Sequence, residues 1–260
     1  MALNPLPLLG RTTLAITHQA GDIGLFGLQY LRQLIKRPFY LRLLFQQIEK
    51  IGADSIPIVM LTAFFTGGVL ALQSYNGFGN AAIAANSLGS VVALSMIREL
   101  GPVLASLMVA GRVGAAIAAE LGTMRVTEQI DALVTLATHP VRYLVVPRIT
   151  ACILVMPLLV CIANVIGILG GYLVATRVLG LSAHTYMERS FQSVAGDDIT
   201  MSLTKAAVFG LIIGLMGCYH GYRTQGGAEG VGRATTVAVV YASVMILISD
   251  YMITALMFNG

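Results

Sequence analysis

The stretch ITACILVMPLLVCIANVIGILGGYLVA, residues 149–175, decides the fold class, because it runs for 27 residues without a charged side chain. A helix needs about 20 mainly apolar residues to cross the hydrocarbon core of a bilayer. The whole chain shares this character: 57% of its 260 residues are hydrophobic, 11% are charged, and the mean hydropathy is +0.81. Soluble domains carry roughly 25% charged residues. We therefore expect an all-α polytopic membrane protein, not a soluble, disordered or fibrous one.

Five apolar runs are long enough to cross a bilayer, and we expect one membrane permease domain over residues 1–260. The expected spans cover 51–73, 88–119, 149–175, 199–219 and 234–258, a bundle over 51–258. An uncharged loop at 74–87 and a polar connector at 177–198 separate spans on one side. At about 20–25 residues per span plus connections, no room remains for a separate soluble domain.

Residues 1–50 are amphipathic instead of continuously apolar. Apolar residues such as Ile23, Phe26 and Tyr30 recur at helical spacing, with polar and basic residues between them. This pattern is typical of helices that lie in the membrane interface, apolar face down. A spanning helix at 14–35 is the alternative, which the charged residues within it weaken.

The distribution of basic residues predicts the orientation. With five spans, twelve Lys and Arg residues fall on one side and two on the other. The twelve are Arg11, Arg32, Lys36, Arg37, Arg42, Lys50, Arg112, Arg125, Arg142, Arg148, Arg223 and Arg233, and the two are Arg177 and Arg189. Because cytoplasmic loops are enriched in Lys and Arg, we expect the N-terminus in the cytoplasm and the C-terminus outside. The net charge of +4 reflects this excess and does not indicate a nucleic-acid partner.

Four ionisable residues lie far enough inside the expected spans to be candidates for charges within the hydrocarbon: Arg98, Glu99, Lys205 and Asp250. Charges in hydrocarbon are costly and usually face a partner or a wet cavity. At about 1.5 Å of rise per residue, all four lie in the outer half of the membrane or near its middle. Arg98 and Glu99 point about 100° apart, so each is expected to pair with another helix, where Lys205 and Asp250 are available. A structural ion-pair network and a polar transport pathway both fit this pattern.

The sequence shows no catalytic arrangement and no metal site. Residues 227–234 carry glycines like those of a phosphate-binding loop but lack its Lys and Ser or Thr. The four histidines have no metal-ligand spacing, and no Ser-His-Asp set or carboxylate pair is evident. We therefore expect no catalytic residue and no cofactor bound by this chain.

The polar segment at 120–137 lies between the second and third spans. Leu121 and Ile130 belong to its apolar face, Thr127 could cap a helix start, and Pro140 would end the helix. A short amphipathic helix at this place suits docking into a groove on a soluble partner. A passive interfacial helix is the alternative.

Longer motifs resemble the MlaE permeases of lipid-transporting ABC systems. Residues 87–133 contain R-E-L-G-P at 98–102 and A-E-L-G-T-M-R-V-T-E-Q at 119–129. The ending, G-R-A-T-T-V-A-V-V at 232–240 and D-Y-M-I-T-A-L-M-F at 250–258, is similar too. The resemblance covers nearly the whole chain from about residue 40.

The resemblance implies a homodimer in the bacterial inner membrane, placed between two cytoplasmic ATPase subunits and a periplasmic ring of MCE-domain proteins. ATP and Mg would be bound by the ATPase, and phospholipid would move between the inner membrane and the periplasmic carrier. The segment around 120–132 would be a coupling helix that docks on the ATPase. The coupling candidates carried over by motif are Glu120, Met124, Arg125, Glu128 and Asp131.

The lipid cavity of this family lies at the dimer interface, lined by the first, second and last spans. That implies Leu70, Gln73 and Tyr75 as lining residues, with Arg98, Glu99, Lys205 and Asp250 close by. Two other classes stay open. One is a stand-alone ion-coupled carrier of a hydrophobic substrate, in which the four charges would be the relay, and the other is a non-transporting membrane anchor.

Overall fold

The computed structural model describes residues 5–36 and 40–258, so Arg37 lies outside the described residues, as does the side chain of Arg11. Within these ranges the chain forms helices and no strand. Five helical stretches are long and apolar enough to cross a membrane: Leu41–Gly77, Ala82–Val126, Val141–Arg177, Gly196–Tyr222 and Gly227–Met257. The predicted all-α fold with five spans is confirmed.

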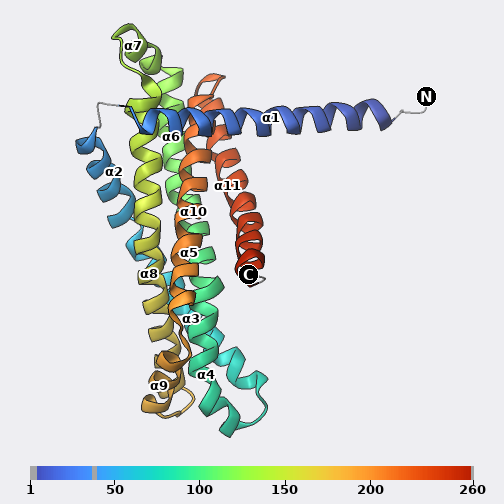
Figure 1. Ribbon diagram of the computed structural model, residues 1–260, viewed down its shortest axis with the longest axis vertical. Coiled ribbons are helices and arrows are strands. Elements are labelled where there is room, and N and C mark those ends of the chain that lie inside the picture. The colour runs from blue at the N-terminus through green and yellow to red at the C-terminus, as the bar shows by residue number, and fades with distance from the viewer. Residues whose placement is uncertain (1–4, 37–39, 259–260) are drawn as a thin grey trace.

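Helix α1 (Pro5–Leu34) lies across one end of the bundle that the other long helices form (Figure 1). Its inward face places Phe26 and Tyr30 in the core, while Leu25 and Leu28 stay exposed. Phe26 packs edge-on against Tyr219, with ring centroids 5.7 Å apart. The interfacial position of α1 stays a prediction, which its direction across the bundle supports.

The first candidate span consists of two helices, α2 (Leu41–Ala53) and α3 (Ile56–Gly77). The break between them is held by Arg112, which donates to Ser55 Oγ at 2.8 Å and pairs with Asp54 at 2.8 Å. Helix α2 covers the amphipathic residues just before the expected start of the span at residue 51, and it packs against the long helix α8 (Val146–Arg177).

The second span is a single long path with two interruptions. It runs through α4 (Ala81–Ser95), the π-helical segment η1 (Met96–Leu100), α5 (Gly101–Val109), the π-helical segment η2 (Ala110–Gly114) and α6 (Ala115–Val126). The expected loop at 74–87 is wrong over most of its length, because α3 continues to Gly77 and α4 begins at Ala81. Asn80 caps α4 by accepting a hydrogen bond from the Ala82 N–H at 2.9 Å.

The remaining elements complete the bundle. They are α7 (Gln129–Thr135), the π-helical segment η3 (Val141–Val145), α8, α9 (Ala183–Ser193), α10 (Gly196–Tyr222) and α11 (Gly227–Phe258). Helix α7 lies at the end crossed by α1, and α9 and α4 lie at the opposite end (Figure 1). The polar connector at 177–198 therefore contains a helix, α9, which packs against α4.

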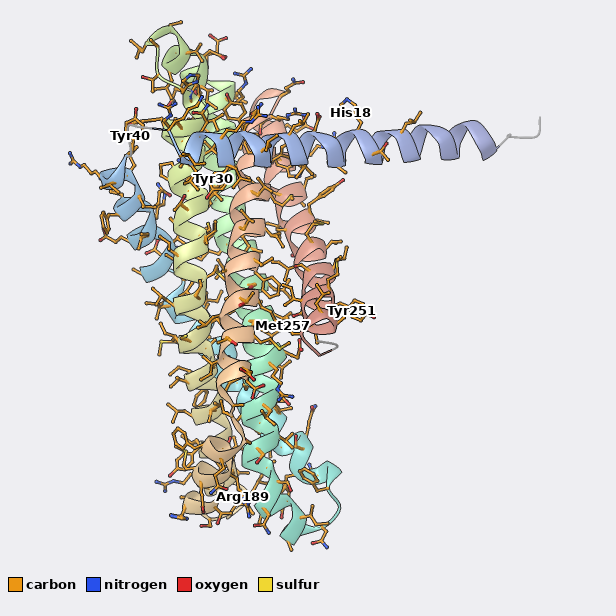
Figure 2. The ribbon with its side chains drawn as sticks, in the orientation of Figure 1. His18, Tyr30, Tyr40, Arg189, Tyr251 and Met257 are labelled. Carbon is orange, nitrogen blue, oxygen red and sulfur yellow. The ribbon has the colours of Figure 1, made fainter. Side chains whose placement is uncertain are left out.

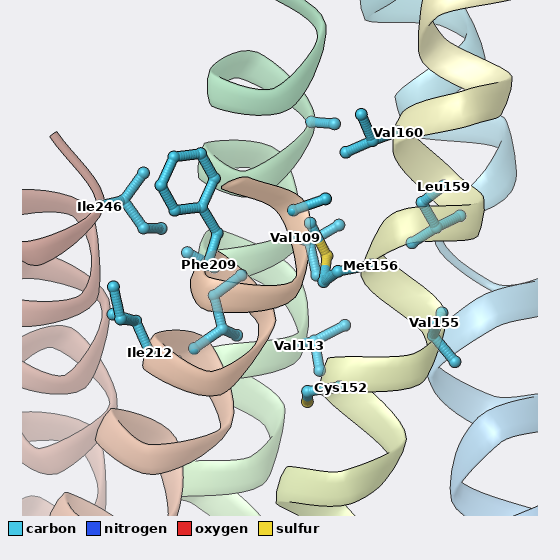
Figure 3. Packing of buried hydrophobic residues seen from close by; sticks show 14 of the residues in the cluster. Val109, Val113, Cys152, Val155, Met156, Leu159, Val160, Phe209, Ile212 and Ile246 are labelled. Carbon is cyan, nitrogen blue, oxygen red and sulfur yellow. The ribbon is translucent and has the colours of Figure 1, made fainter. Parts of the chain in front are cut away.

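The core lies where α8 and α10 meet the second span. Figure 3 shows Met156 and Cys152 of α8, Phe209 of α10 and Val109 of α5 within this cluster. Helix α3 packs along the other side of α8, and α11 packs along α10 and α6.

Glycines allow two of these contacts to close at the backbone. A Cβ on Gly67 of α3 would collide with the carbonyl oxygen of Gly167 in α8, and one on Gly210 of α10 would lie 2.5 Å from that of Cys152. Both glycines belong to small-residue pairs, Gly67-Gly68 and Gly210-x3-Gly214, of a kind that allows helix backbones to approach. Gly111-x-x-Gly114 is a similar pair, but an added Cβ on Gly111 meets no atom within 4 Å.

Candidate functional site

Three of the four predicted membrane charges meet in one cluster. Lys205 Nζ lies 2.7 Å from Glu99 Oε2 and 2.7 Å from Asp250 Oδ1. The Lys205 side chain is fully buried, whereas Glu99 remains 40% exposed. One ammonium group thus joins α10, η1 and α11, and the triad of Glu99, Lys205 and Asp250 carries two negative charges and one positive charge.

A proline explains one further contact of Lys205. In a regular α-helix the carbonyl of Arg98 would accept a hydrogen bond from the N–H of residue 102, but Pro102 has no N–H. Lys205 Nζ donates to this carbonyl oxygen at 3.0 Å instead. The R-E-L-G-P motif therefore supplies both a carboxylate and a free carbonyl to the same lysine.

Arg98 belongs to a different pair. Its Nε donates to Asp198 Oδ1 at 2.6 Å, and Asp198 Oδ2 accepts from the Ala195 N–H at 3.0 Å. The expectation that Arg98 would use Asp250 is therefore wrong. Because Arg98 and Glu99 diverge around the helix, Glu99 reaches Lys205 while Arg98 reaches the first turn of α10.

A groove runs along α3. Leu70 and Gln73 line it together with Phe65, Thr66, Val69 and Leu100. Leu100 directly follows Glu99, so the groove and the triad share the segment η1, although none of the three triad residues lines the groove. Tyr75 does not line this groove, and its half-buried side chain packs against the hydrophobic core.

The predicted coupling residues divide between two places. Glu120 lies in α6, where it pairs with Lys50 of α2 and, at 3.2 Å, with Arg148 of α8. Its side chain therefore links three helices at this end of the bundle. Met124 is also turned toward the protein, since it packs against the core.

The other coupling residues surround α7 at the tip of the molecule. Arg125 Nη1 lies 2.6 Å from Asp131 Oδ1, and the exposed Glu128 has a left-handed backbone with φ of 58° where α7 begins. The expected cap at Thr127 is wrong, because its hydroxyl donates back to the Thr123 carbonyl at 2.8 Å.

Residues 44–256 match the family described as permease MlaE. The chain belongs to the MlaE permease family. A probable ABC transporter permease protein of Rickettsia typhi is 52% identical over 100% of both chains. The intermembrane phospholipid transport system permease protein MlaE of Haemophilus influenzae is 36% identical, also over 100% of both. The chloroplastic protein TRIGALACTOSYLDIACYLGLYCEROL 1 of Arabidopsis thaliana is 38% identical over 89% of this chain and 66% of its own length.

As an MlaE-family permease with five candidate spans, the chain is a multi-pass membrane protein. Of the five candidate spans, the last is the least buried, and its Tyr251 projects away from the bundle, as Figure 2 shows, with 76% of the residue exposed. Asp250, one residue away, faces inward to Lys205. In this permease α11 therefore contributes Asp250 to the triad from its inward face and exposes an apolar face outward.

Sequence reasoning missed three residues near these sites. Asp198 was placed in a connector, although a carboxylate in the first turn of an apolar helix is a recognisable signal. Thr254, one turn after Asp250, donates to Glu99 Oε1 at 3.2 Å. Val134 is 57% exposed at the tip of this permease, two residues before Leu136, which is 74% exposed.

Proposed function

We propose that this chain is the membrane-spanning subunit of an ATP-driven transporter that moves phospholipid between the bacterial inner membrane and a periplasmic MCE carrier. Family membership and the phospholipid-transport name of the Haemophilus influenzae relative support the class of substrate. The observation that carries the proposal is the triad of Glu99, Lys205 and Asp250, together with the groove of Leu70 and Gln73, which Leu100, the residue after Glu99, also lines. Charged groups beside an apolar groove suit a molecule with a polar head and apolar chains.

The assembly that we propose contains two copies of the chain. The exposed apolar residues of α11 and α3, among them Val244, Tyr251 and Phe65, form a surface that a second copy would cover. The groove lined by Leu70 and Gln73 would then lie between the two copies, and Tyr75 would lie outside its lining. An MCE-domain ring would sit at the end that carries α4 and α9.

Two ATPase subunits would dock at the opposite end, around α7. The exposed Val134 and Leu136 offer apolar contacts there, and Arg125, Glu128 and Asp131 offer charged ones. ATP and Mg would be held by the ATPase. In this arrangement the α7 end, with the N-terminus, faces the cytoplasm, as the twelve basic residues predict. Glu120 and Met124 would transmit movement within the permease, since both contact its own helices.

A reconstitution experiment tests the function. The complex with its ATPase is placed in liposomes of labelled phosphatidylglycerol, and transfer of the label to soluble MCE protein is measured. Transfer is expected only with hydrolysable ATP. The proposal fails if the purified chain without ATPase moves lipid on an ion gradient.

A second candidate function is an ion-coupled carrier without an ATPase. The buried Lys205 between two carboxylates favours it, because such groups form proton relays in transporters. The two candidates give opposite results in the liposome experiment. A proton gradient would replace ATP for the carrier and have no effect for the ATP-driven permease.

A further inference from the structure

A polar pocket lies at the α7 end, away from the triad and its groove. It is bounded by the middle of α1, the last turns of α10 and the first turns of α11, and its volume is about 580 Å³. Small-molecule sites measure roughly 300–1,000 Å³. The residues that give it its chemistry are His18, Asp22, His220, Arg223, Arg233 and Tyr241. We call it the α1 pocket.

Positive charge predominates in the α1 pocket. It contains the guanidinium groups of Arg223 and Arg233 and one carboxylate, that of Asp22, so the formal charges +2 and −1 leave +1. Arg223 is held in place by an ion pair to Asp22 and by Tyr219 Oη, to which it donates at 3.2 Å. Arg233 is exposed and has no ion-pair partner in the part of the chain that the structure describes. Arg223 is thus a fixed part of the pocket wall, and Arg233 is available to a ligand.

The pocket walls hold further groups with hydrogen-bonding capacity. The His220 ring stands beside the ring of Tyr241, with centroids 5.2 Å apart, and its buried Nε2 has no hydrogen-bond partner among the described residues. A buried nitrogen without a partner costs free energy, so this side of the pocket keeps an unsatisfied hydrogen-bonding group. His18 stands on the side of α1 that faces the α7 end (Figure 2). Arginine and histidine together are typical ligands of phosphate groups.

The surroundings indicate where such a phosphate would come from. Beyond the pocket, α11 continues with the exposed Val240 and Val244. The pocket therefore sits where an apolar outer surface gives way to a charged end. A phosphate in the pocket would leave its acyl chains along the apolar face of α11.

We propose that the α1 pocket binds the phosphate of an anionic phospholipid headgroup, with Arg233 as the principal ligand. This site is separate from the triad and its groove, and it does not depend on which molecule is transported. Basic pockets between helices at the cytoplasmic side commonly hold anionic lipid headgroups.

Binding of a defined lipid tests the proposal. The full chain is purified in detergent, and short-chain dihexanoyl phosphatidylglycerol is titrated while thermal unfolding is recorded, which gives an apparent Kd. Arg233→Gln is expected to weaken binding about tenfold, as the loss of one charge-assisted hydrogen bond does. The matched control is Arg177→Gln, an exposed arginine at the opposite end, which should leave the affinity unchanged.

Two further ligands separate the possible sources of the phosphate. Glycerol 1-phosphate carries a phosphate monoester, which is more negative at neutral pH than the phosphodiester of phosphatidylglycerol, and it has no acyl chains. Dihexanoyl phosphatidylcholine carries a zwitterionic headgroup. Both should bind at least tenfold more weakly than phosphatidylglycerol. Equal binding of glycerol 1-phosphate would mean a soluble phosphate compound, and equal binding of phosphatidylcholine would remove the role of charge. Either result, or an unchanged affinity in Arg233→Gln, overturns the proposal.

Discussion

At the scale of single residues, the charged side chains were informative because few of them lie within the membrane spans. Glu99, Lys205 and Asp250 could be predicted to meet, because a charge in hydrocarbon must have a partner and the chain offers few. The partner of Arg98 could not be predicted in the same way. Asp198 lies where the apolar run begins, and only the packing of α10 against η1 shows that it reaches into the bundle.

The triad predicts an asymmetric response to substitution. Lys205→Met removes the only positive charge of the triad and leaves two carboxylates without it, so we expect a loss of about 3 kcal/mol in unfolding free energy. Glu99→Gln keeps the contact between Lys205 and Asp250 and should cost less than about 1 kcal/mol, since Glu99 is 40% exposed. Thermal unfolding in detergent measures both. Equal losses would show that the ammonium is not the centre of the triad.

The contact between α1 and α10 predicts a pH dependence. The hydrogen bond and charge of Arg223 hold the pKa of Asp22 below its usual value of 3.8. A carboxyl with a lowered pKa in the folded state stabilises above its usual pKa, and this contribution disappears as pH falls through the folded-state value. The attachment of α1 should therefore stay constant from pH 8 to 5 and weaken only below about pH 4.

Hydrogen exchange of α1 amides measures this effect in a His18→Gln background, where the imidazole near Asp22 is absent. The control is Asp22→Asn in the same background, which should lack the change below pH 4. A loss of protection near pH 6 in both proteins would show that another group controls the attachment.

At the scale of elements, the number of spans was predictable and their ends were not. Apolar length predicts a crossing helix wherever it occurs, as in 149–175. The ends of helices depend on individual hydrogen bonds and ion pairs. The Asn80 cap makes the loop shorter than expected, and Arg112 fixes the break between α2 and α3. The π-helical segments η1 and η2 could not be predicted, because no distinct pattern of apolar residues in the sequence marks them. Such segments are frequent at functional sites.

The glycines of α3 and of the second span predict opposite effects of the same change. Gly67→Ala places a methyl group against the Gly167 carbonyl and must push α3 from α8, which should cost about 1–3 kcal/mol. Gly111→Ala meets open space and should be neutral or slightly stabilising. Thermal unfolding of the two variants in the same detergent compares them. A Gly111→Ala variant as unstable as Gly67→Ala would contradict the packing of the single chain.

At the scale of the whole molecule, one helical path connects the two ends. The stretch Ala82–Val126 carries Glu99 at the triad and leads to the turn that presents α7. Glu120, near the end of this stretch, also forms ion pairs with Lys50 of α2 and Arg148 of α8. A displacement of α7 can therefore reach the first three spans at once. The sequence motif at 119–129 suggested a docking segment, but its division into a buried α6 part and an exposed α7 part depends on the fold.

This division predicts which residue a partner would contact. Leu136 is 74% exposed beside α7, and removing its side chain in Leu136→Ser should weaken ATPase association about tenfold, since burial of one leucine contributes about 1.5 kcal/mol or more. Phe191→Ser is the control, because Phe191 is 75% exposed on α9 at the opposite end. Co-purification with the ATPase and lipid-stimulated ATP hydrolysis are the measurements, with the unfolding temperature showing that both variants are folded. Equal association of the two variants would place the docking surface away from α7, whereas a loss confined to Leu136→Ser would place it at the end of the path that leads to the triad.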